Sequence, residues 1–218
     1  MELKPKIPRP TVKRLSLYLR ELGAHVAAER ATVSSKQLGS VLGLTDAQVR
    51  KDLAYFGQFG HPGVGYSVPL LHSHLIKILG LDRSWSAALV GTGNIGRALL
   101  SYRRFEEHNF FISAVFDRDS SCIGQTIEGR VVYPMDDLDR VIREGSIRLG
   151  IVAVPADVAQ EVADRLSDAG VTGILNFAPR RLDVHKDVSV SSVDFTLALE
   201  QLAFQVSLGL TGSLDDDA

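Results

Sequence analysis

The stretch Val90-Gly91-Thr92-Gly93-Asn94-Ile95-Gly96 decides the expected fold. An apolar run over residues 85–90 leads into it, and a second apolar segment follows it at residues 95–100. In a strand–turn–helix unit the first glycine forms the turn, the second admits a pyrophosphate to the helix N-terminus, and the third lets the helix pack against the strand. The spacing therefore predicts a dinucleotide-binding loop. Its expected ligand contacts are Gly91, Thr92, Gly93, Asn94, Ile95 and Gly96.

An acidic residue follows the next expected strand. The apolar run over residues 110–116 ends at Asp117, at about the distance from the glycines at which a carboxylate meets the adenosine ribose hydroxyls. Because a carboxylate repels a 2′-phosphate, Asp117 favours NADH and NAD+ over their phosphorylated forms, while Arg118 beside it tempers that preference. The alternative is a Rossmann-like scaffold with a vestigial nucleotide site.

The rest of the C-terminal part alternates between strand-like and helix-like segments. The strand-like runs cover residues 127–133, 149–154, 173–177 and 188–193, and the helix-like segments cover residues 137–144 and 156–169. This alternation is typical of an α/β fold, here a doubly wound parallel sheet of Rossmann type. The nicotinamide half of a dinucleotide lies at the carboxyl ends of such strands, so Pro155 and Phe177 are expected there.

The N-terminal part begins with three expected helices. The apolar stripe of the first, over residues 11–28, is formed by Val12, Leu15, Leu19 and Leu22, with Lys13, Arg14, Arg20 and Glu21 off it. Ser34 and Gln37 have the spacing of a capping box before a second helix at residues 35–42. Thr45 and Gln48 repeat that spacing before the third helix, whose inward residues are Val49, Leu53 and Phe56.

Two short capped helices joined by a glycine turn predict a helix-turn-helix. The outward residues of the third helix are Ala47, Gln48, Arg50 and Lys51, so its start can contact base edges while its cations contact phosphates. Residues 57–66 then contain four glycines between aromatic residues, which is typical of a hairpin wing. The sequence predicts a winged helix. The alternative is a small helical bundle whose cations are merely solvated.

Charge separates the two parts of the chain. The net charge is -2, but residues 1–80 contain 11 Lys and Arg against 5 Asp and Glu, whereas residues 81–218 contain 13 against 21. We therefore expect a winged-helix domain at residues 1–80 that approaches a polyanion, and a Rossmann and dimerisation domain at residues 81–218.

Composition sets further limits. No apolar run approaches the roughly 20 residues of a membrane span, and residues 1–6 lack the apolar core of a signal peptide, so we expect a cytoplasmic protein without a membrane partner. The single cysteine, Cys122, forms neither an internal disulfide nor a cysteine metal cluster, and we expect no metal.

The last expected helix, residues 195–208, is apolar on nearly every side. Such a helix must be covered all round, and the cover that we expect is a second subunit, which predicts a homodimer.

An enzyme would need a substrate domain and a placed acid or base. Only one helix follows Asp194, and none of the six histidines lies beside Pro155 or Asn176 in the sequence. The dinucleotide is therefore expected to act as a signal. The alternative is a small NAD-dependent oxidoreductase with a fused basic domain.

Five blocks in order resemble the Rex family of redox-sensing transcriptional repressors over residues 7–210. They are Ser34-Ser35-Lys36-Gln37-Leu38, Gln48-Val49-Arg50-Lys51-Asp52-Leu53, Gly63-Val64-Gly65-Tyr66, Gly91-Thr92-Gly93-Asn94-Ile95-Gly96-Arg97-Ala98-Leu99 and Gly173-Ile174-Leu175-Asn176-Phe177-Ala178-Pro179. The resemblance implies a homodimer with an exchanged C-terminal helix. It would repress genes at double-stranded operator DNA when NADH is scarce and leave the operator when NADH rises.

The resemblance also implies roles for individual residues. Arg20 and Asp194 would pair between the domains in the DNA-binding form, and Phe195 would approach the nicotinamide. The other expected cofactor contacts are the glycine loop, Tyr102, Asp117, Arg118, Pro155 and Phe177. The expected DNA contacts are Ser34, Ser35, Lys36, Gln48, Arg50, Lys51, His61 and Tyr66. The family usually carries a cation in the wing where this sequence has His61-Pro62, so insertion of the wing into the minor groove would depend on a partly charged His61.

Overall fold

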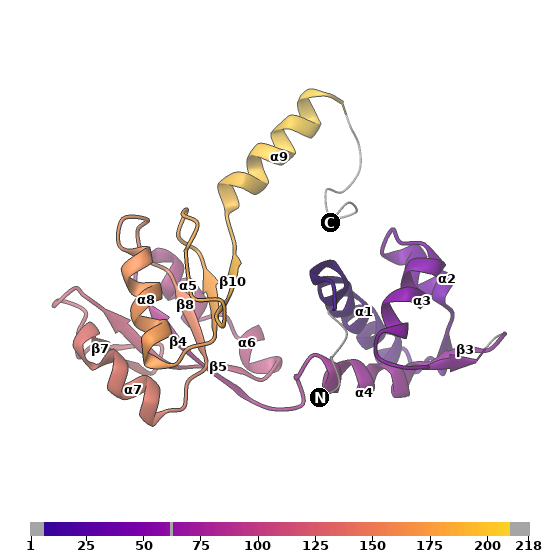
Figure 1. Ribbon diagram of the computed structural model, residues 1–218, viewed down its shortest axis with the longest axis horizontal. Helices are drawn as coiled ribbons and strands as arrows, with labels where there is room; N and C mark the ends of the chain where they lie inside the picture. The colour runs from indigo at the N-terminus through magenta and orange to yellow at the C-terminus, as the bar shows by residue number, and fades with distance from the viewer. Residues whose placement is uncertain (1–6, 62, 210–218) are drawn as a thin grey trace. The chain divides into compact units, whose positions relative to one another are not determined.

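A computed structural model describes residues 7–61 and 63–209 of the chain (Figure 1). The described chain divides into two compact units: the first reaches to Asp82, the second runs from Arg83 to Phe204, and residues 205–209 group with the first. The domain bounds expected from the sequence stay a prediction. Pro62, the N-terminal hexapeptide and the acidic C-terminal tail lie outside the described residues.

The first unit has the element order of a winged helix. Its elements are α1 (Arg9–Ala27), β1 (Thr32–Val33), α2 (Ser35–Val41), α3 (Asp46–Ala54), β2 (Gly60–His61), β3 (Gly65–Ser67) and α4 (Val68–Ile78). The strands form a small antiparallel sheet in the order β1-β3-β2. Ser34 and Gln37 form the predicted capping box of α2, and the Thr45 side chain caps α3.

The buried face of α1 differs from the expected stripe. Leu15, Tyr18 and Leu22 are at most 1% exposed, whereas Val12 is 44% exposed. The prediction missed Tyr18 because its phenol was not counted as apolar, although the ring packs in the core of this unit. It also placed Arg14 off the buried face, but that guanidinium is mostly buried, with 15% of the side chain exposed.

The wing is followed directly by a helix. Val68 is the first residue of α4 and is fully buried. The helix begins there because Pro69 favours the first turn, where its missing N–H costs nothing. We did not predict α4 or β1 from the sequence.

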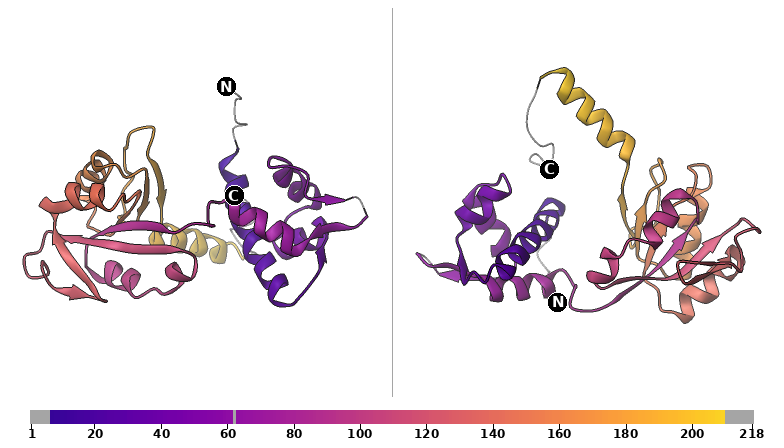
Figure 2. Two further views of the ribbon diagram at one scale, coloured as in Figure 1. Left: turned by 90° about the horizontal axis from the view of Figure 1, so that it is seen from below. Right: turned by 180° about the vertical axis from the view of Figure 1, so that it is seen from behind.

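The second unit is a seven-stranded sheet with helices on both faces. Its elements are β4 (Trp85–Val90), α5 (Asn94–Leu100), α6 (Arg104–Glu107), β5 (Phe110–Asp117), β6 (Thr126–Ile127), β7 (Arg130–Pro134), the 3-10 helix η1 (Met135–Asp137), α7 (Leu138–Glu144), β8 (Leu149–Val152), α8 (Ala159–Ala169), β9 (Gly173–Asn176), β10 (Ser189–Ser192) and α9 (Phe195–Ser207). Figure 2 shows α7 and α8 on one face and α5 and α6 on the other.

The strand order confirms the doubly wound fold. The order is β10-β9-β8-β4-β5-β7-β6, with every pair parallel except β6 and β7. The six parallel strands thus run third, second, first, fourth, fifth, sixth, which is the order of dinucleotide-binding sheets. Because the chain changes direction between β4 and β8, a crevice opens there at the carboxyl ends of the strands.

The segment 127–133 is a hairpin and not the single strand that we predicted. β6 and β7 are antiparallel, joined by Glu128 and Gly129, whose φ angles are 47° and 77°. The turn was missed because the segment was taken as one continuous strand across Glu128 and Gly129. The other predicted strands and helices of this part are present, with ends that shift by up to three residues.

The helix α9 is exposed along its length in the single chain. Its large apolar side chains are between 51% and 71% exposed and are Phe195, Leu197, Leu199, Leu202, Phe204 and Val206. Cover of this helix by a second subunit stays a prediction. Among the described residues, every helix is too short or too polar to cross a bilayer.

Candidate dinucleotide site and DNA-binding surface

The three glycines of the loop after β4 differ in what a side chain would meet at each position. Gly91 has φ +101°, and a Cβ there would collide with the Ala153 carbonyl of the neighbouring β8 loop. A Cβ at Gly96 would collide with the Gly91 carbonyl oxygen, so this glycine permits the tight turn between β4 and α5. A Cβ at Gly93, in contrast, would meet no described atom within 4 Å. Gly93 is therefore free of a packing requirement and borders open space.

Asp117, at the end of β5, faces the same loop. Its Oδ2 accepts hydrogen bonds from the Thr92 backbone N–H at 2.7 Å and from the Thr92 hydroxyl at 2.5 Å. Its Oδ1 accepts a bond from the backbone N–H of Asp119 at 3.0 Å. Burial opposes ionisation, but these hydrogen bonds outweigh it and hold the pKa of Asp117 below its ordinary value. The carboxylate is thus charged and fixed beside the loop.

A cavity of about 480 Å³ opens at the carboxyl ends of β4, β5 and β8. Of the predicted cofactor contacts, it is lined by Gly91, Thr92, Gly93, Asp117, Arg118 and Pro155. Lining residues that the sequence analysis missed include Asp119, Cys122, Met135, Val158, Val162 and Arg165. The three apolar residues among these suit the flat face of an adenine, because cofactor sites are mostly apolar with a few placed polar groups. They lie on η1, α8 and the loops beside them, where no motif singles them out.

Other predicted cofactor contacts lie outside the lining of this cavity. Asn94, Ile95 and Gly96 form the start of α5, behind the loop. Tyr102 is 47% exposed and packs edge-on against Phe105, with ring centroids 5.1 Å apart. Phe177 and Phe195 lie near one another, with ring centroids 6.2 Å apart, so the loop after β9 meets the start of α9. The roles of these residues toward a nicotinamide stay predictions.

A second hollow, of about 630 Å³, lies between the α2 N-terminus, α3 and the wing. The predicted DNA contacts that line it are Ser34, Ser35, Arg50, His61 and Tyr66. Arg50 donates to Asp46 at 2.6 Å and to Ser35 at 3.2 Å. These two bonds hold the guanidinium between the N-terminal ends of α2 and α3. Lys36 and Lys51 are exposed outside this hollow, on α2 and α3.

Tyr66, one of the predicted DNA contacts, has a packing role that the sequence analysis did not assign. The residue is only 8% exposed and packs in the core of the first unit, and burial raises its pKa. Its ring anchors the wing: a Cβ at Gly60 on the paired strand would lie 2.8 Å from it. Tyr66 therefore packs the wing, and its contact with DNA stays a prediction.

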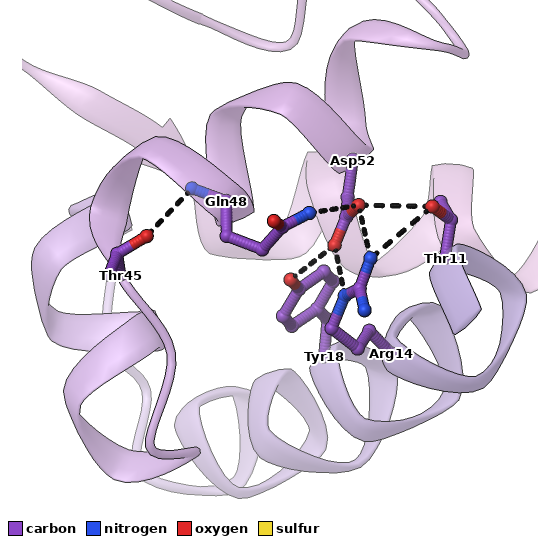
Figure 3. Close-up of polar contacts among 6 residues, drawn as sticks. All are labelled: Thr11, Arg14, Tyr18, Thr45, Gln48 and Asp52. Carbon is purple, nitrogen blue, oxygen red and sulfur yellow. Dashed lines mark hydrogen bonds and ion pairs between the residues drawn. The ribbon is translucent and has the colours of Figure 1, made fainter. Parts of the chain in front are cut away.

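Gln48 and Asp52 form a polar cluster that the sequence analysis missed (Figure 3). Gln48 was expected to point outward, but it is partly buried and its amide Nε2 donates to Asp52 Oδ1 at 2.8 Å. Asp52 itself is fully buried between α3 and α1. A signal was present in the spacing: Asp52 is three residues after the inward-facing Val49, so it lies on the buried face of α3.

The proposed switch residues lie in separate units. Arg20 is exposed on α1 in the first unit. Asp194, in the second, caps α9: its Oδ1 accepts from the backbone N–H groups of Thr196 at 2.9 Å and Leu197 at 3.1 Å. The cap is a role that the sequence analysis did not assign. Pairing of Arg20 with Asp194 stays a prediction.

The fold and these two sites together define a class: a winged-helix DNA-binding unit joined to a Rossmann unit with a dinucleotide cavity. Two family models match in the same order. "Putative DNA-binding protein N-terminus" covers residues 6–54 and "CoA binding domain" covers residues 82–180.

Comparison with known proteins identifies the family. The chain is 51% identical over 201 residues to the redox-sensing transcriptional repressor Rex of Carboxydothermus hydrogenoformans, covering 92% of this chain and 97% of the relative. It is 48% identical over 201 residues to Rex of Desulfitobacterium hafniense, covering 92% and 96%. The chain belongs to the Rex family of redox-sensing transcriptional repressors.

Solved structures agree. The Rex-family repressor RSP, in complex with β-NAD+ and operator DNA, is 33% identical, with a TM-score of 0.89 and coverage of 93% of this chain and 94% of that one. RSP in complex with β-NADH matches with a TM-score of 0.85 at 32% identity, covering 94% and 96%. The winged-helix and Rossmann architecture predicted from the sequence is confirmed.

Proposed function

We propose that this protein represses transcription at double-stranded operator DNA and that NADH, bound in the cavity after β4, releases it. The observation that carries the proposal is the cavity itself, where the open Gly93 and the ionised Asp117 lie beside the same loop of a chain that also contains a winged helix. The complexes of RSP with β-NAD+ plus operator DNA and with β-NADH support both ligands. We place the protein in the cytoplasm, where such DNA lies.

The dinucleotide acts as a signal in this proposal. The named relatives of this chain are repressors, which sets the oxidoreductase alternative aside. Among the described residues, the lining of the cavity includes neither His nor Lys to serve as a hydride-transfer acid or base. The differential affinity of NADH for the free form over the DNA-bound form is what shifts the equilibrium.

We propose that the working form is a homodimer with α9 exchanged between subunits. The exposed apolar side chains along α9 support this, because a helix that is apolar on all sides requires cover. Winged-helix proteins that bind as dimers contact two half-sites one or more helical turns apart. Sedimentation of the full chain should therefore give a dimer, and Leu199→Glu with Leu202→Glu should give a monomer.

Gel retardation with the DNA upstream of the protein's own gene tests the proposal. We expect a shifted band without dinucleotide and with NAD+, and its loss with NADH. Lys51→Ala and Arg50→Ala should each reduce the salt dependence of binding by about one phosphate contact. A band that is unchanged by NADH, in a protein that binds NADH, would overturn the proposed switch.

A further inference from the structure

The buried carboxylate of Asp52 connects α3, the helix that we expect to contact base edges, to α1 (Figure 3). Asp52 accepts five hydrogen bonds from four side chains. The donors are Thr11 at 3.1 Å, Arg14 at 2.6 and 2.9 Å, Tyr18 at 2.8 Å and Gln48 at 2.8 Å. Three of the four donors belong to α1 and the fourth to the first turn of α3, so the carboxylate fixes both the position of α3 and the side chain of Gln48.

The bond to Asp52 settles which end of the Gln48 amide is free. An ionised carboxylate only accepts hydrogen bonds, so the group that faces Asp52 must be the donating Nε2. Within the part of the chain that the structure describes, no hydrogen bond uses the carbonyl Oε1 of Gln48. The backbone N–H of Gln48 is occupied by the Thr45 cap at 3.1 Å. The free hydrogen-bonding group of this residue is therefore an acceptor.

We propose that Gln48 reads one base through its carbonyl oxygen alone, with Asp52 as the positioning residue that withholds its amide nitrogen. In the major groove an acceptor selects an exocyclic amine, which adenine and cytosine present there; the amine of guanine faces the minor groove, and thymine has none. The proposal rests on the proposed function, because it requires that the start of α3 enter the major groove. It predicts one operator position that accepts adenine or cytosine and disfavours guanine and thymine.

The competing arrangement is the two-bond contact of glutamine with adenine, in which the carbonyl accepts from N6 and the amide donates to N7. That contact needs the Nε2 that Asp52 occupies. Asp52 is fully buried and cannot turn to water for a replacement donor, whereas Gln48 is only partly buried. Breaking the bond would exchange a hydrogen bond to an ionised carboxylate for one to a neutral N7, and bonds to charged groups are about twice as strong as neutral ones.

Selection from a pool of random DNA duplexes, using the full chain, tests this proposal and does not require the operator sequence. We expect the parent to enrich a motif with one position of mixed adenine and cytosine. Gln48→Glu keeps an acceptor, loses the donor, and is repelled from the Asp52 carboxylate, so it should keep this position while binding all duplexes more weakly. Gln48→Met keeps the side-chain length and loses the acceptor, so it should abolish the preference, which we expect to be about fivefold or greater, and leave the other positions unchanged.

Two results would overturn the proposed role of Gln48. One is a parent that selects adenine alone at a position that Gln48→Glu loses, which means a two-bond contact. The other is a Gln48→Met variant that keeps every preference, which means no base contact. Failure of the proposed function is distinguishable, since it gives no enriched motif with the parent chain in any condition.

A third variant tests the positioning role of Asp52. Arg14→Met, Tyr18→Phe and Asp52→Leu together replace the charged cluster by apolar groups, a change that buried ion pairs often tolerate. Freed from Asp52, the Gln48 amide gains access to N7, so the mixed position should narrow to adenine. A melting curve shows whether the variant is folded. An unchanged mixed position in folded protein would overturn the role of Asp52; if the variant does not fold, the Gln48 pair still decides the proposal.

Discussion

Thr92 binds the Asp117 carboxylate through both its backbone N–H and its hydroxyl, at 2.7 and 2.5 Å. Both bonds reach Oδ2, and Oδ1 accepts from the backbone N–H of Asp119 in the turn that follows, at 3.0 Å. The carboxylate is therefore oriented by the loop that approaches the pyrophosphate, and its second oxygen retains acceptor capacity for ribose hydroxyls. This relationship joins the two parts of the motif that the sequence displayed separately.

Removal of this carboxylate should change cofactor preference. Asp117→Ala loses the ribose contacts and the repulsion of a 2′-phosphate, so NADH should bind roughly 30-fold more weakly, about 2 kcal/mol, while NADPH binds as well as or better than before. Titration of nicotinamide fluorescence with each dinucleotide measures this. Equal losses for NADH and NADPH would show that Asp117 does not face the ribose.

Substitutions at Gly93 and Gly96 should separate an effect on NADH binding from an effect on folding. Gly93 borders open space, so Gly93→Val should melt like the parent but lose NADH affinity by about tenfold or more, which is about 1.4 kcal/mol. Gly96→Ala is the matched control, because its Cβ would collide with the Gly91 carbonyl and should destabilise the second unit by about 1–3 kcal/mol. Normal NADH titration by folded Gly93→Val would place the dinucleotide elsewhere.

Acid should weaken the first unit through Asp52. Burial opposes ionisation of this carboxylate, but bonds from Arg14, Tyr18 and Gln48 outweigh burial and hold its pKa below the ordinary value. Because the folded pKa is lowered, the stabilisation is present above the ordinary carboxyl pKa of about 4 and is lost as pH falls through the folded pKa.

Asp52→Asn should therefore lower the free energy of unfolding by about 3 kcal/mol at neutral pH, and the difference from the parent should shrink in acid. Thermal melting across this pH range measures it. A difference that stays constant down to strong acid would mean that Asp52 does not titrate with folding.

The switch pair can be separated from the helix cap that Asp194 provides. Asp194→Asn keeps a good capping residue for α9 and removes the charge, whereas Asp194→Ala removes both. If Asp194 pairs with Arg20 in the DNA-binding form, Asp194→Asn alone should weaken operator binding. In a double-mutant cycle with Arg20→Ala the coupling should exceed about 0.5 kcal/mol. Strictly additive losses of operator affinity would mean that Asp194 caps α9 but does not pair with Arg20.

The sequence predicted the parts of the fold that local pattern dictates. The glycine loop, Asp117 and the capped helices α2 and α3 follow from spacing along one segment. The burial of Tyr66 and Asp52 was missed because it depends on packing between segments: Tyr66 packs in the core of the first unit, and Asp52 is buried against α1. The apolar residues that line the cavity, Met135, Val158 and Val162, were missed for the same reason. They come from η1, from α8 and from the residue before α8, and the strand order of the sheet is what brings these segments beside the glycine loop.

The most direct test of the redox switch is operator binding at a fixed total dinucleotide concentration with the NADH fraction varied. Fluorescence anisotropy of a labelled duplex, taken from the random-pool selection, reports how much protein remains bound. We predict that bound DNA falls as the NADH fraction rises, and that Gly93→Val binds DNA at every ratio without responding. Release that depends only on the total dinucleotide concentration, or no release in protein saturated with NADH, would contradict the account.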